Sequence, residues 1–90
     1  MELLWTAEAD QEMVVLERTP GDIEVRAVRR TLGRIESDPN EPRLGTRLFV
    51  TDGLGHVRAT PTGTGDWYVL WQAGPTAGAV TILHVIELSI

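Results

Sequence analysis

The 90-residue sequence contains no cysteine and no lysine, and only 6% of its residues are aromatic. Without cysteine, the chain can form neither a disulfide framework nor a thiolate metal site. No apolar run approaches the roughly 18 residues of a membrane-spanning helix. The acidic N-terminal segment also lacks the basic and apolar regions of a secretion signal. These absences predict a cytoplasmic protein without a membrane segment.

The overall composition is that of a folded domain. Hydrophobic residues make up 42% of the chain and charged residues 23%, which is ordinary for a globular protein and argues against disorder. At this length we expect a single domain over residues 1–90. Its core must be small, so burial against a partner chain would add stability.

Charge is distributed unevenly along the chain. The eight basic residues are all arginine, and the formal net charge is −5. Residues 1–24 carry seven acids against one arginine, whereas residues 25–58 carry seven arginines against four acids. An acidic total argues against non-specific coating of nucleic acid, because that affinity comes from neutralised phosphates. A local basic face in the middle of the chain remains compatible with this pattern.

Two amphipathic helices are predicted in the first half. The first follows residue 6, and its apolar stripe has helical spacing: Ala9, Met13 and Leu16. The second is expected over residues 20–36, opened by a capping box at residues 19–22 and ended by the Asp38-Pro39 pair. Its apolar arc comprises Val25, Val28, Leu32 and Ile35.

The remaining segments predict strands. They cover residues 2–5, 46–51, 56–61, 67–73 and 79–88. The last two flank a Gly-Pro-Thr-Ala-Gly turn and should form a hairpin at the centre of the sheet. The expected fold is α+β, in the order β-α-α-β-β-β. A helical hairpin packs on one face of an antiparallel sheet of three to five strands.

Several polar residues are candidates for a functional site. On the second helix Arg26, Arg30 and Arg34 lie opposite the apolar arc, either as a solvated face or as a site for phosphate or an acidic partner. Arg58, with Arg47 nearby, either faces solvent or holds a phosphate.

His84 alternates with Val80, Ile82 and Ile86, which places it on an apolar face. It is either a hydrogen-bonded core or interface residue or a general acid or base. If it faces Arg58, RNA cleavage by transfer to the 2′-hydroxyl becomes chemically possible. The two histidines lack ligand spacing, so no metal site is predicted.

The order of these elements, and four short motifs within it, resembles the RelE/ParE family of bacterial toxins. The motifs are WTAEA at residues 5–9, RIESDP at 34–39, GDWYVLW at 65–71 and VTILHV at 80–85. The third is similar to the Gly-Asp-Tyr-Arg-Val-Ile-Tyr strand of the family, with Tyr68 where the family has arginine. The chain also lacks the family's Gly-His-Arg-like ending, carrying Ile86-Glu87-Leu88 instead.

This resemblance implies a toxin that is neutralised by a cognate antitoxin. Most such toxins cut mRNA on the ribosome without a metal, and the ParE branch poisons DNA gyrase. As a ribonuclease without cofactor, the chain would use Arg58 for phosphate charge, His84 for proton transfer and Tyr68 to stack or orient RNA. The alternatives are a gyrase inhibitor and a non-catalytic module that binds a partner or dimerises. The exposed-looking Val14-Val15 pair makes a homodimer a further hypothesis.

Overall fold

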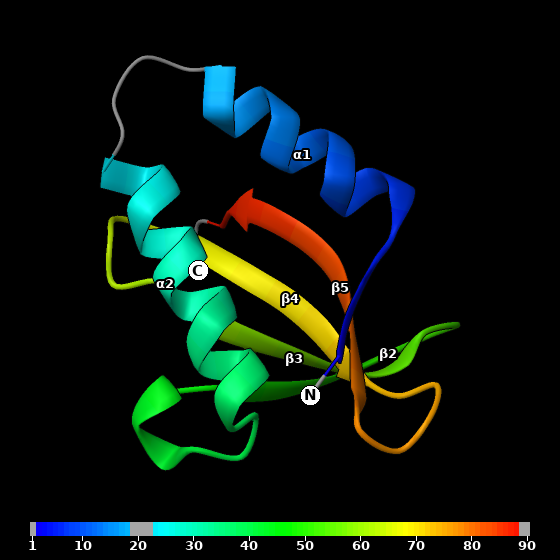
Figure 1. Cartoon of the computed structure of the whole chain (residues 1–90). Coiled ribbons are helices and arrows are strands. Elements are labelled where there is room, and N and C mark those ends of the chain that lie inside the picture. The colour runs from blue at the N-terminus through cyan, green and yellow to red at the C-terminus, as the bar shows by residue number, and fades with distance from the viewer. Residues whose placement is uncertain (1, 19–22, 89–90) are drawn as a thin grey trace.

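The computed structural model describes residues 2–18 and 23–88, which form a layer of helices on a five-stranded sheet (Figure 1). The elements are β1 (Glu2–Trp5), α1 (Ala7–Arg18), α2 (Ile23–Ser37), the 3₁₀ turn η1 (Pro42–Leu44), β2 (Arg47–Thr51), β3 (Gly55–Pro61), β4 (Trp67–Ala73) and β5 (Ala79–Glu87). The α+β class is confirmed, with a first strand, two helices and then strands, but four strands follow the helices where the predicted order β-α-α-β-β-β has three. The predicted capping box at residues 19–22 lies outside the described residues.

The sheet has the strand order β1-β5-β4-β3-β2. Strands β2 to β5 form the expected antiparallel meander, but β1 pairs parallel with β5. The sheet is therefore mixed, whereas the sequence predicted an antiparallel one. A parallel neighbour needs a long crossover connection, and here the whole chain between β1 and β5 provides it.

Both helices cover the same face of the sheet, α1 over β5 and α2 over β4 (Figure 1). The predicted apolar stripes are buried: Ala9, Met13 and Leu16 on α1, and Val28, Leu32 and Ile35 on α2. Val25 is partly buried and packs against the same core. None of the helices in residues 2–18 and 23–88 is long and apolar enough to cross a membrane.

Trp71 on β4 is the largest fully buried side chain of the described core. Its indole N–H donates a 2.9 Å hydrogen bond to Thr60 Oγ1, and that hydroxyl lies 2.7 Å from Thr46 Oγ1. A buried indole N–H needs such a partner, because an unpaired donor in the core costs free energy. The Trp71–Thr60 bond thus ties β4 to β3 beneath α2.

The helices leave the second face of the sheet uncovered (Figure 1). We call this the open face. Alternation along the strands assigns to it Arg47, Phe49, Tyr68, Leu70, His84 and Ile86.

Candidate functional site

The structure places Arg58 and His84 on opposite faces of the sheet. Arg58 lies directly opposite Trp71, so both side chains project toward the helices. Leu70, the neighbour of Trp71 on β4, points to the open face, and His84 is its partner on β5. The Arg58–His84 pair considered from the sequence therefore does not form one site.

Tyr68 and Arg47 share the open face with His84. Tyr68 is two residues from Leu70 on β4 and lies opposite Ile86, which makes it a diagonal neighbour of His84. Arg47 stands in the same row as His84, three strand spacings away, or roughly 14 Å at about 4.8 Å per strand. Three of the predicted site residues are thus brought to one exposed surface.

A β-bulge in β5 sets the position of His84. Trp71 pairs with Ile82, and Leu70 pairs with His84, so Leu83 is an extra residue without a partner. The simple alternation of the sequence predicted His84 on the same face as Ile82, and this prediction is wrong because the bulge reverses the alternation. Bulges re-aim a side chain in this way.

His84 is held by a carboxylate from α1. Its Nδ1 lies 3.1 Å from Glu12 Oε1, and the same oxygen accepts a 3.2 Å hydrogen bond from the Val85 N–H. The two side chains are partly exposed, 39% for His84 and 28% for Glu12. With Nδ1 engaged, Nε2 is the ring nitrogen left for a ligand, because a hydrogen bond to one nitrogen fixes the role of the other. This is the arrangement of a general acid or base oriented by a carboxylate.

Glu12 was not predicted as a site residue. The sequence does contain a signal for it, since Glu12 follows Ala9 by three residues and precedes Met13, on the edge of the buried stripe of α1. An acid at the edge of a core-facing stripe needs a partner from the surface that it packs against. That partner lies on β5, 72 residues further along the chain.

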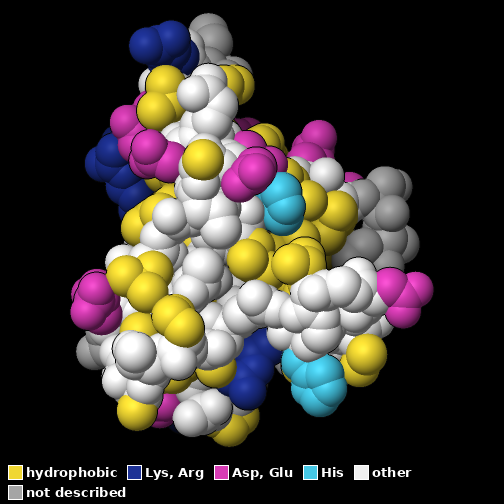
Figure 2. All heavy atoms as spheres, turned by 90° about the vertical axis from the view of Figure 1, so that its right-hand side faces the viewer, with side chains coloured by type: hydrophobic (Ala, Val, Ile, Leu, Met, Phe, Trp, Pro, Cys, Tyr) yellow, Lys and Arg dark blue, Asp and Glu magenta, His cyan; other side chains and the backbone are white. Residues whose placement is uncertain are grey.

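Apolar and aromatic side chains lie beside this pair on β4 and β5 and farther along the open face on β2. Leu70 and Ile86 are partly buried beside Tyr68, and Phe49 is 41% exposed on β2. Figure 2 shows an acidic side chain and a histidine side by side, above a patch of hydrophobic side chains. Aromatic and apolar side chains on an exposed surface can pack against unstacked bases of single-stranded RNA.

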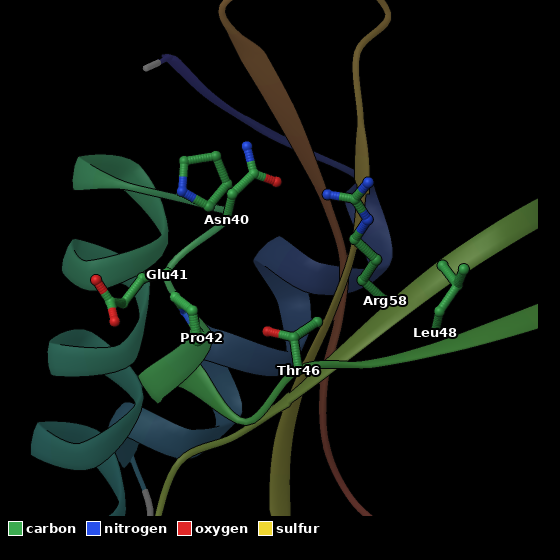
Figure 3. Close-up of a pocket in the computed structure, with 7 residues that line it drawn as sticks. Asn40, Glu41, Pro42, Thr46, Leu48 and Arg58 are labelled. Atoms are coloured by element: carbon green, nitrogen blue, oxygen red, sulfur yellow. The ribbon is translucent and has the colours of Figure 1, made fainter.

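Arg58 forms a separate site on the helix-bearing face. Its guanidinium carbon lies 5.1 Å from the centroid of the Trp71 ring, a cation–π contact that fixes the side chain. It lines an open pocket of about 250 Å³ together with Pro39, Asn40, Glu41, Pro42, Thr46 and Leu48. In Figure 3 the Arg58 guanidinium and the Asn40 amide point into the same space, whereas the Glu41 carboxylate points away.

The Arg58 pocket is suited to an anion. Glu41 Oε1 already accepts a 3.1 Å hydrogen bond from the Arg43 N–H, and no ion pair is formed by Arg58 within residues 2–18 and 23–88. A guanidinium without a carboxylate partner keeps its donors for phosphate or carboxylate. The described lining of this pocket contains no histidine, so it favours binding over proton transfer.

The arginines of α2 lie on the outer side of that helix. Arg26, Arg30 and Arg34 are exposed, opposite the buried residues of the same helix. Arg29, between them, forms a 3.2 Å ion pair with Glu17 of α1. This surface is distinct from both the open face and the Arg58 pocket.

In the described part of the chain, no three acidic or histidine side chains gather in a way that could hold a metal ion.

Two helices on one face of the sheet and a meander whose last strand meets β1 form an α+β fold of the RelE/ParE-like kind. The solved structure of a YoeB/ParE toxin from Agrobacterium tumefaciens superposes with a TM-score of 0.80, over 99% of this chain and 100% of that chain. The two sequences are 10% identical, so the likeness is one of fold. The fold expected from the sequence motifs is thereby confirmed. No protein-family model and no curated protein matches the sequence.

Proposed function

We propose that this protein is the toxin component of a type II toxin–antitoxin system and acts as a metal-independent, ribosome-dependent mRNA endoribonuclease. The observation that carries the proposal is the Glu12–His84 pair beside Tyr68 on an uncovered sheet face. The full-length similarity to a YoeB/ParE toxin supports the toxin class. A cognate antitoxin is then the partner that keeps the protein inactive.

The open face supplies a chemically complete set of roles for RNA cleavage. His84 Nε2 takes the proton of a 2′-hydroxyl, and Glu12 stabilises the imidazolium that forms. The 2′-oxygen then bonds to phosphorus while the bond to the 5′-oxygen breaks, and the leaving oxygen takes a proton from water. Tyr68 stacks on a base next to the cut, which holds the 2′-hydroxyl in place.

The two cations bind at a distance from the reacting phosphate. Arg47, roughly 14 Å from His84 by strand spacing, contacts a phosphate further along the RNA. Arg58, on the other face, binds a carboxylate or phosphate of the antitoxin or the ribosome. The exposed arginines of α2, Arg26, Arg30 and Arg34, provide additional contacts to ribosomal RNA.

The test is induced expression in a bacterial host, with growth and mRNA integrity followed for the wild type, His84→Ala and Tyr68→Ala. His56→Ala is the matched control, because His56 is the other of the two histidines in the sequence and is exposed on β3. We expect growth arrest and ribosome-dependent cleavage in the wild type and control. Loss of proton transfer in His84→Ala should slow cleavage by about 10²–10⁴-fold.

Two outcomes would contradict this proposal. Intact mRNA with unimpaired growth would instead indicate a non-catalytic binding module with this fold. The net charge of −5, which disfavours RNA binding, would agree with that outcome. Growth arrest with DNA damage and intact mRNA would identify a gyrase inhibitor instead.

A further inference from the structure

Strand β2 is an uncovered edge of the sheet with an apolar surface. It ends the strand order, with β3 on one side and no strand on the other among the described residues. All five of its residues are exposed, and three are apolar: Leu48 at 56%, Phe49 at 41% and Val50 at 75%. Natural edge strands are usually protected by charged side chains, proline, a bulge or a covering segment. Of these devices β2 has a charged side chain only at its first residue, Arg47, and its other four residues are uncharged.

We propose that β2 is a homodimer interface, in which the β2 strands of two copies pair antiparallel across a two-fold axis at Phe49. The pairing continues the sheet through both copies and satisfies the outward N–H and C=O groups of each edge. The proposal rests on the exposed strand and is independent of the toxin function.

The sequence of β2 is self-complementary in this register. Phe49 meets Phe49 of the partner subunit, and Leu48 meets Val50 of the partner subunit, so the cross-strand pairs of the centre are apolar or aromatic. The two-fold axis is perpendicular to the sheet, so the open faces of both copies lie on the same side of the joined sheet. Residues that pair across the interface then point to the same side. The helices of both copies then lie on the same side of the joined sheet.

The charges at the two ends of β2 also suit the antiparallel arrangement. Arg47 begins β2, and Asp52 follows its last residue. In this register Arg47 lies opposite Thr51 of the partner subunit, one residue from Asp52 of the partner subunit, so opposite charges flank each end of the interface. Neither Arg47 nor Asp52 has an ion-pair partner within the described parts of its own chain.

The dimer would complete the Arg58 pocket. Leu48 lies opposite Arg58 in the sheet and lines its pocket. Val50 of the partner subunit, paired with Leu48, would extend the apolar wall of that pocket. A single pair of short strands buries less surface than a standard interface, so we expect dissociation in roughly the micromolar range or weaker.

Sedimentation velocity of the purified full chain over about three orders of magnitude in concentration tests the proposal. The wild type should pass from monomer to dimer. Phe49→Lys places two ammonium groups opposite each other at the axis and should weaken dimerisation at least about tenfold, as should Val50→Lys. Leu54→Lys is the matched control: Leu54 is 56% exposed in the same hairpin but lies outside β2, so its dimer should persist.

A charge exchange provides a second measurement that does not depend on the apolar variants. Arg47→Glu and Asp52→Arg should each weaken the dimer, and the double variant should restore it. A monomer at every concentration would overturn the proposal and leave the edge for a strand of another protein, such as an antitoxin. A dimer that survives Phe49→Lys and Val50→Lys but is lost in Val15→Lys would also overturn it, and would move the interface to α1.

Discussion

Replacement of Glu12 tests the central contact of the candidate site. Glu12→Ala removes the acceptor of the Val85 N–H and the partner of His84 Nδ1 at once. A hydrogen bond to a charged group contributes about 1.5–3 kcal/mol when well shielded, whereas exposed ion pairs contribute about 0.2–1 kcal/mol. Because the side chains are 28% and 39% exposed, we expect a loss of about 1–2 kcal/mol in the free energy of unfolding.

Glu12→Gln separates the two contacts. The amide oxygen can still accept from the Val85 N–H, but the carboxylate charge that faces His84 is gone. We therefore expect a smaller stability loss, below about 1 kcal/mol. Cleavage should nevertheless fall, since the imidazolium would lose its stabilising charge. A fall in cleavage with little change in stability would distinguish an orienting carboxylate from a merely structural one.

Urea unfolding followed by circular dichroism measures these effects. Glu36→Gln is the matched control: Glu36 is an exposed acid on α2, and its change should stay within about 0.5 kcal/mol. A double variant of Glu12→Ala and His84→Ala should lose less than the sum of the single changes, because the residues interact. Additive losses, or a Glu12→Ala protein as stable as the wild type, would refute the contact.

Two further predictions concern the core. Thr60→Val should cost about 1–3 kcal/mol, because it leaves the buried Trp71 indole N–H without its acceptor; urea unfolding checks this, and a neutral result would mean that the bond contributes nothing. Ile35→Ala should cost about 2–5 kcal/mol through the cavity left at a fully buried position. By contrast, Ile23→Ala, at a position 66% exposed, should change the free energy of unfolding by about 0.5 kcal/mol or less.

The helices and strands could be predicted from the sequence because their signals are local. Apolar spacing identified the buried stripe of Ala9, Met13 and Leu16, and β-branched and aromatic residues identified β4 at its observed bounds. The parallel pairing of β1 with β5 could not be predicted in the same way. It joins segments from opposite ends of the chain, and no local pattern encodes that contact.

The geometry of the candidate site was predicted less well than the fold, because it depends on one extra residue in β5, Leu83. Every assignment of β5 side chains to a face assumed strict alternation, and the bulge at Leu83 breaks it. The bulge leaves Arg58 and His84 on different faces and gives His84 a partner, Glu12, that is not among the predicted site residues. Strand alternation alone carries no signal for an extra residue.

The cause of this geometry lies in how α1 follows β1. After β1 ends at Trp5, the Thr6 N–H still donates to the Ile82 carbonyl, and the Thr6 hydroxyl donates to the Leu83 carbonyl while it caps α1 through the Ala9 N–H. Glu12, two turns further on, accepts the Val85 N–H. Beyond the end of β1, Thr6 and the first turns of α1 therefore supply the hydrogen-bond partners along the same edge of β5, next to its bulge. Because the same contacts dock the helix and orient His84, any change that shifts α1 on the sheet would also disturb the imidazole.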